Sequence, residues 1–130
     1  MLFYKFLSQE ERRSFGGSDF VEFSYCKLSK DTNPRDILST NISHWNNSSL
    51  YICGDDCDRF YENYGEIMTD GIYANLEKGC LDWFGINYFN SAELLSIIDK
   101  IKLLKPYDYK TLLDWLESGK DYNGFYVLGV

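Results

Sequence analysis

The sequence contains little proline, a single histidine and no long apolar run. Two prolines and one histidine occur among 130 residues. A membrane-spanning helix needs about 20 consecutive, mainly apolar residues, and no such stretch is present. The chain opens on Leu2-Phe3-Tyr4, without the basic stretch and small-residue cleavage site of a secretory signal peptide. We therefore expect a cytoplasmic protein that does not enter a membrane.

Motifs that hold phosphates or metals are also missing. The ten glycines form neither G-x-G-x-x-G nor G-x-x-x-x-G-K-[ST], the loops that cradle phosphate groups. Cys53 and Cys57 are separated by three residues, one more than in a redox C-x-x-C pair, and no second pair or neighbouring histidines complete a zinc set. We expect thiols that flank a helix start, no disulfide, and no metal or cofactor. The four cysteines are Cys26, Cys53, Cys57 and Cys80.

The sequence shows no catalytic set. A general base or an activated nucleophile would have to be built on His44, the only histidine, or on a carboxylate with a shifted pKa. His44 precedes Trp45 and a loop rich in Asn and Ser. We interpret it as a partly exposed structural residue, and we expect a protein that is not an enzyme.

Aromatic and apolar residues are abundant. Eleven Tyr, nine Phe and three Trp make 18% of the chain aromatic, and 45% of the residues are hydrophobic. A chain of this length buries roughly two thirds of its unfolded surface on folding and has the size of one domain. Residues 1–130 are therefore expected to form a single globular domain.

The clearest local pattern is a pair of amphipathic helices between Asn90 and Gly119. Asn90 is an N-cap residue with Glu93 three positions on, and Pro106 ends the first helix because its ring restricts the residue before it. Asp108 is the expected cap of the second helix, and Gly119 the expected left-handed residue that closes it. The apolar stripes comprise Leu94, Ile97, Ile98, Ile101 and Leu104, then Tyr109, Leu112, Leu113 and Leu116, with Trp115 alongside.

Runs of β-forming residues predict the strands. They are residues 2–7, 20–28, 50–53, 81–89 and 125–128, with a hairpin of 66–69 and 72–75 around Asp70-Gly71. Short helices are expected after Ser8, at about 34–40, and behind the acidic residues at 55–58. This order predicts an α+β fold, with a mainly antiparallel sheet and a C-terminal antiparallel helix pair followed by a final strand.

Strand 20–28 shows the most regular alternation. Val21, Phe23 and Tyr25 share one face, whereas Glu22 and Ser24 share the other. The pattern predicts a strand that is buried on one face and exposed on the other.

Acidic charge is concentrated between Gly54 and Asp82. This segment has eight acidic and two basic residues, a net charge of −6, whereas the whole chain has a net charge of −7. We therefore expect no direct nucleic-acid binding, because such binding needs cations arranged along a phosphate backbone. Carboxylates interleaved with aromatic residues suit an interface with a basic protein. The alternative is that the carboxylates face solvent and the aromatic rings fill the core. The aromatic residues are Phe60, Tyr61, Tyr64, Tyr73 and Trp83.

Taken as a whole, this small, acidic, aromatic-rich chain without a catalytic set resembles bacterial immunity proteins, including those of contact-dependent growth inhibition. The resemblance implies a protein that binds one cognate toxin, often a nuclease, and neutralises it by covering its active site or substrate surface. It further implies a basic protein toxin as the partner, with no membrane or small-molecule ligand. The expected partner-binding residues are Asp55, Asp56, Asp58, Tyr61, Glu62, Tyr64, Glu66 and Asp70.

An alternative function stays open at this point. An aromatic-rich α+β domain can also bind or convert a small molecule in a pocket. The residues proposed for such a pocket are 83–86 (Trp-Phe-Gly-Ile), with His44 among its polar groups.

Overall fold

A computed structural model describes residues 1–16, 19–39 and 41–129 of the chain. Its six strands form one sheet in the order β2-β1-β6-β5-β3-β4, and every neighbouring pair is antiparallel. The strands are β1 (Phe20–Tyr25), β2 (Leu50–Cys53), β3 (Gly71–Tyr73), β4 (Lys78–Gly79), β5 (Ile86–Phe89) and β6 (Phe125–Leu128). The predicted α+β fold with an antiparallel sheet is confirmed.

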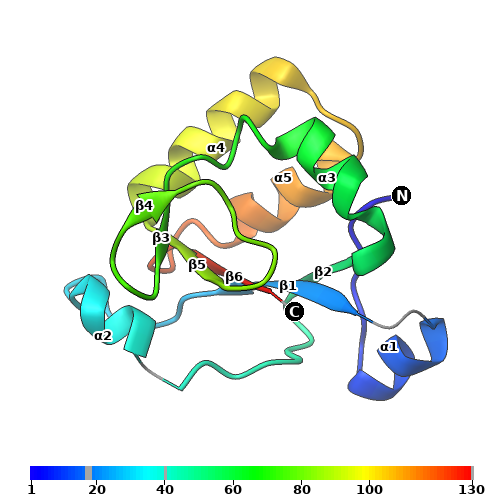
Figure 1. The fold of residues 1–130 in the computed structure, drawn as a ribbon, viewed down its shortest axis with the longest axis horizontal. Helices are drawn as coiled ribbons and strands as arrows, with labels where there is room; N and C mark the ends of the chain where they lie inside the picture. The colour runs from blue at the N-terminus through cyan, green and yellow to red at the C-terminus, as the bar shows by residue number, and fades with distance from the viewer. Residues whose placement is uncertain (17–18, 40, 130) are drawn as a thin grey trace.

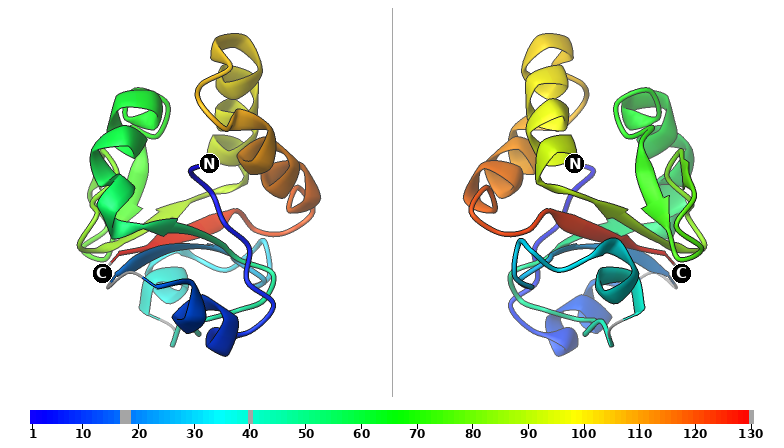
Figure 2. Two further views of the ribbon diagram at one scale, coloured as in Figure 1. Left: turned by 90° about the vertical axis from the view of Figure 1, so that its right-hand side faces the viewer. Right: turned by 90° about the vertical axis from the view of Figure 1, so that its left-hand side faces the viewer.

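Helices cover both faces of the sheet (Figure 1). They are α1 (Gln9–Phe15), α2 (Pro34–Ser39), a 3-10 turn η1 (Gly54–Asp56), α3 (Cys57–Tyr64), α4 (Ser91–Leu104) and α5 (Tyr109–Ser118). Figure 2 shows α3, α4 and α5 on one face and α1, α2 and the connection after α2 on the other. The predicted end of α2 at Thr40 lies outside the described residues. Among the described residues, no helix combines the length and apolar character needed to cross a membrane.

The main core lies between the sheet and helices α3, α4 and α5. It joins Val21 and Phe23 of β1 to Phe125 of β6, and it includes Phe60 of α3 and Ile98 of α4. Two smaller clusters fill the other face of the sheet, one beneath α2 and one beneath α1. The sheet is therefore a central layer with apolar contacts on both sides.

The C-terminal helix pair forms as predicted. The Asn90 side chain accepts a hydrogen bond from the Glu93 N–H at 2.9 Å, and Lys105 leaves the helical region with φ +46° before Pro106. The buried residues are Leu94, Ile97, Ile98 and Ile101 in α4, and Leu112, Trp115 and Leu116 in α5. The prediction for Leu104 was wrong because this last-turn residue is 60% exposed.

Both expected terminal residues of α5 act differently from the prediction. Asp108 makes no side-chain cap to its own helix; its Oδ2 instead accepts hydrogen bonds from the N–H groups of Leu2 and Phe3, at 2.8 and 2.9 Å. Gly119 has φ −102°, which is not left-handed. Asp108 thus binds the N-terminal segment instead of capping α5. At the other end, Gly119 packs closely against the Tyr25 ring instead of closing the helix as a left-handed residue.

The predicted strand at residues 2–7 is absent. Only Tyr4 pairs, in an isolated bridge in which Tyr4 and Tyr51 exchange both backbone hydrogen bonds, at 2.9 and 2.8 Å. The Asp108 carboxylate takes the N–H groups of Leu2 and Phe3. These two N–H groups were expected to bond to a neighbouring strand, but the Asp108 side chain accepts their hydrogen bonds instead.

The predicted hairpin around Asp70-Gly71 is also absent. Ile67 and Met68 are buried, and their N–H groups donate to the Tyr64 carbonyl at 3.0 and 3.1 Å. The chain after α3 thus continues as turns, and β3 pairs with β4 and β5 instead. In the predicted strand 81–89, only residues 86–89 pair, as β5.

Strand β1 is buried on both faces, contrary to the half-buried prediction. Glu22 is 3% exposed and Ser24 is 6% exposed. The alternation correctly separated these residues from Val21 and Phe23, which face the main core. Burial of the polar face follows because residues 44–49 cover it and supply hydrogen-bond donors to Glu22.

Candidate functional site

Four acidic residues, spaced three or four positions apart, lie in α3 and in the turns at its two ends. Asp58 and Glu62 are four residues apart, Asp55 stands three residues earlier, and Glu66 four residues later in the turn that continues the helix. Residues three and four apart lie on one side of a helix, and all four side chains are exposed. We call these four residues the α3 acidic face. Asp70 is also exposed, whereas Asp56 is half-buried.

The α3 acidic face forms no ion pair within the described residues; Arg59, the one basic residue of α3, lies over the Tyr107 ring. Within the part of the chain that the structure describes, Glu117 pairs with Lys102 and Lys120, and His44 lies near Glu22; no ion pair includes the four residues. Like charges four residues apart destabilise a helix by about 0.2–0.5 kcal/mol per pair, although Asp58 benefits from the positive end of the helix dipole. The negative field of this surface is therefore directed to solvent.

The aromatic residues of the acidic segment lie mostly inside the protein. Tyr64 is 0% exposed, and its hydroxyl donates to the Tyr107 carbonyl at 2.7 Å. Phe60 and Trp83 belong to the main core, and half-buried Tyr61 packs on Trp83 with ring centroids 5.9 Å apart. The structure places Tyr64 in the core, contrary to its expected role as a partner contact, because Phe60 and Tyr64 are on the apolar side of α3 that faces the sheet.

Phe84, which the sequence placed in the lining of the alternative pocket, is instead an exposed aromatic residue that the predicted interface did not include. Its side chain is 77% exposed, directly after Trp83, which packs against α3. The Asp82 side chain accepts the Phe84 N–H at 3.0 Å, and the Gly129 N–H donates to the Gly85 carbonyl at 2.8 Å. An Asp whose side chain bonds the backbone two residues on is a known turn signal. The turn fixes Phe84 outside the core.

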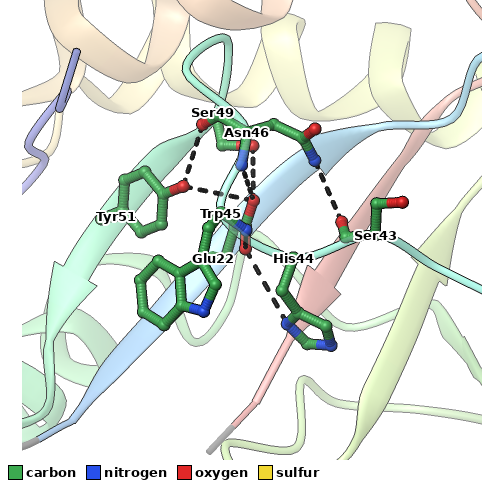
Figure 3. A network of polar contacts seen from close by, with 7 residues as sticks. All are labelled: Glu22, Ser43, His44, Trp45, Asn46, Ser49 and Tyr51. Carbon is green, nitrogen blue, oxygen red and sulfur yellow. Dashed lines mark hydrogen bonds and ion pairs between the residues drawn. The ribbon is translucent and has the colours of Figure 1, made fainter. Parts of the chain in front are cut away.

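A buried carboxylate organises the opposite face of the sheet (Figure 3). The partners of Glu22 are the N–H groups of Trp45 (2.9 Å) and Asn46 (3.2 Å), the Ser49 hydroxyl (2.7 Å) and the Tyr51 hydroxyl (3.4 Å). Burial, followed by the Glu22 charge, raises the pKa of the Tyr51 phenol. Because a buried charge needs such partners, Glu22 fastens residues 45–49 to the sheet.

His44 stands at the edge of this network. Its Nδ1 is 3.8 Å from Glu22 Oε1, and its side chain is 52% exposed, as the sequence interpretation predicted. Trp83 lies in the core on the other side of the sheet. The structure therefore does not bring His44 and residues 83–86 into one pocket.

The thiols flank the start of α3, as interpreted from the sequence. All four cysteines are free. Cys53 is buried at the end of β2, and Cys57 is the half-buried first residue of α3. Burial and then Asp58 raise the pKa of the Cys57 thiol, which disfavours the nucleophilic thiolate. Among the described residues, no group of three or more His, Cys, Asp or Glu side chains is placed to hold a metal ion.

Comparisons with known proteins do not assign a family. No protein-family model, curated protein sequence or solved structure matches this chain. The function has to be argued from the charge, exposure and rigidity of its own surface residues.

Proposed function

We propose that this protein is an immunity protein, which binds a basic protein toxin in the cytoplasm and neutralises it by covering its active site or substrate surface. The observation that carries the proposal is the α3 acidic face, with Asp58 and Glu62 exposed on α3, Asp55 exposed in the 3-10 turn before it and Glu66 exposed in the turn after it. The four carboxylates outnumber the one cation of α3, Arg59, whose guanidinium lies over the Tyr107 ring, and they form a surface suited to a cationic partner.

A nuclease is the toxin class that fits this surface best. Nucleases need Lys and Arg side chains to hold the phosphate backbone, and carboxylates at helical spacing present negative charge to the same cations. The formal net charge of −7 adds a long-range attraction toward such a protein. Docking of the α3 acidic face would therefore compete directly with the nucleic acid.

Phe84 supplies an apolar contact next to the segment that packs on α3. Interface hot spots are enriched in large side chains that enter a pocket of the partner. Phe84 is 77% exposed and sits on a turn held by Asp82 and by the Gly129–Gly85 hydrogen bond. Because the turn is already ordered, binding through Phe84 loses little backbone entropy.

Co-expression with a toxin tests the proposal. Immunity genes typically lie directly downstream of their toxin gene, so the product of a large reading frame immediately upstream is the partner to use. We expect the two proteins to co-purify and cells that make the toxin to survive when this protein is present. Absence of both a complex and protection would contradict the immunity function.

Phe84→Ala and Leu103→Ala form a matched pair for the same assay. Both side chains are exposed, at 77% and 81%, but Leu103 is on α4. Loss of a hot-spot aromatic residue costs about 2 kcal/mol or more, so Phe84→Ala should weaken toxin binding by more than tenfold. Leu103→Ala should leave it unchanged, and equal effects of the two variants would remove Phe84 from the interface.

A further inference from the structure

A second candidate site lies on the other face of the sheet, away from the α3 acidic face. It is a cleft of about 240 Å³ between α1, β1, the loop at His44-Trp45 and the end of β6. The charged and aromatic residues that line the cleft are Arg12, Asp19, Phe20, Glu22, His44 and Trp45. Both signs of charge therefore meet in one small cleft.

Arg12 brings a cation to the cleft, and no hydrogen bond from its side chain is found among the described residues. Its guanidinium carbon lies 3.7 Å from the Trp45 ring centroid and 5.4 Å from that of Phe20. Its Nε is shielded from solvent. Within residues 1–16, 19–39 and 41–129, Nε has no hydrogen-bond partner and no carboxylate forms an ion pair with Arg12. Because Nε is shielded, a ligand carboxylate would pair with the terminal nitrogens of the guanidinium, in the charge-assisted geometry typical of Arg–carboxylate pairs.

The position of the Arg12 guanidinium is fixed by a stack of side chains. Trp45 lies on Tyr51 with ring centroids 5.5 Å apart and an interplanar angle of 10°, and its N–H is held by Glu22. Figure 3 shows Trp45 and Tyr51 beside the Glu22 carboxylate. Since Arg12 packs over the held Trp45 ring, the cation is pre-positioned for a ligand and loses little side-chain freedom on binding.

The acidic side of the cleft comes from Glu22 and Asp19. Glu22 Oε1 accepts the Trp45 N–H at 2.9 Å, while His44 Nδ1 is 3.8 Å away, beyond a normal hydrogen bond. A carboxylate oxygen accepts two hydrogen bonds, so Oε1 retains capacity for a donor in the cleft. Asp19 is exposed and lines the same cleft.

We propose that this cleft binds a small zwitterion, an α-amino acid, with its carboxylate on Arg12 and its ammonium group on Glu22 and Asp19. The two carboxylates would repel a simple anion, and the guanidinium would repel a simple cation. A zwitterion can pair with the guanidinium and with the carboxylates at the same time. Pockets for drug-sized ligands span about 300–1,000 Å³, so a cleft of about 240 Å³ suits a smaller molecule. This site is independent of the proposed toxin interface.

The test is a titration of the full, isotope-labelled chain, followed by the NMR signals of the Trp45 indole and of the backbone near Glu22. The probes are glycine and the other common amino acids. Acetate and methylammonium, which carry only the carboxylate and only the ammonium group of glycine, are the controls. We expect at least one amino acid to bind roughly tenfold or more tightly than either control, since each charge-assisted pair contributes about that factor.

Arg12→Gln and Arg13→Gln are the matched variants, because both arginines are on α1 and Arg13 is exposed and does not line the cleft. Arg12→Gln should weaken amino-acid binding by roughly tenfold or more, and Arg13→Gln by less than twofold. If Arg12→Gln does not fold, Asp19→Asn provides the corresponding loss from the acidic side. Acetate binding as tightly as every amino acid, or no response to any amino acid, would overturn the proposal; toxin binding should be unchanged in Arg12→Gln.

Discussion

The ring of Tyr25 occupies the space that a side chain at Gly119 would need. A Cβ atom at position 119 would lie 2.3 Å from Tyr25 Cε1. The same ring stacks on Trp115, with centroids 4.1 Å apart and an angle of 7°, and its hydroxyl donates to the Trp115 carbonyl at 2.8 Å. This contact fixes the end of α5 against the central part of the sheet.

Gly119→Ala should therefore destabilise the protein, although φ −102° suits any residue. An added methyl group has to displace Tyr25 from its stack, and overpacking of this kind costs about 1–3 kcal/mol. Chemical denaturation gives the free energy of unfolding, with Ser118→Ala as the exposed neighbouring control. A change below about 0.5 kcal/mol, the range of ordinary surface substitutions, would show that Tyr25 can move freely.

Asp108 should stabilise the N-terminal segment. It accepts the N–H groups of Leu2 and Phe3, both of which are 0% exposed. Hydrogen bonds to a charged group contribute about 1.5–3 kcal/mol, so Asp108→Gly should cost about that much in unfolding free energy. Glycine is chosen because it accepts the positive φ of +57° at this position without strain. Unchanged hydrogen exchange at Leu2 and Phe3 would contradict this role.

The faces of α4 can be tested with two alanine variants. Ile98 is 2% exposed and Leu104 is 60% exposed. Ile98→Ala should cost about 2–5 kcal/mol, because it removes buried methyl groups and leaves a cavity. Leu104→Ala should change the unfolding free energy by less than about 0.5 kcal/mol. Similar losses at the two sites would mean that the helix packs with a different face.

Stability should fall at alkaline pH. Burial raises the pKa of Tyr25 from 10.0 to about 12, so the unfolded chain releases this proton at lower pH than the folded protein does. The stabilisation is fully present below pH 10 and is lost as the pH rises through about 12. Denaturation midpoints measured across this range should decline, and Tyr25→Phe should reduce the slope. A slope equal to that of the parent would exclude Tyr25 as a contributor.

The parts of the fold that depend on local sequence could be predicted. The cap at Asn90, the break before Pro106 and the α4 stripe up to Ile101 involve residues within a few turns of one another, and all are present in the structure. The strand predicted at 2–7 is absent because its donors go to Asp108, about a hundred residues away. Such a pairing leaves no local pattern in the sequence.

In the candidate site, too, local features could be predicted from the sequence, whereas features that depend on long-range packing could not. The exposed carboxylates of the α3 acidic face follow from charge and helical spacing, whereas the burial of Tyr64 depends on how α3 packs on the sheet. The turn that carries the exposed Phe84 is also held by a long-range hydrogen bond, from the Gly129 N–H to the Gly85 carbonyl. Glu22 was assigned to an exposed face because residues 44–49, which bury it, lie on a loop whose path the sequence does not indicate.

The most direct test of toxin binding through the α3 acidic face is the association rate with the basic toxin. Asp55→Lys, Asp58→Lys and Glu62→Lys reverse its charge; the same net change made at Asp99, Asp114 and Asp121, all exposed, is the control. We predict that the first triple variant slows association by tenfold or more at low salt, and that the parent slows similarly as salt screens the charges. The control triple should retain most of the rate. Equal rates for the two triple variants would contradict the proposed interface.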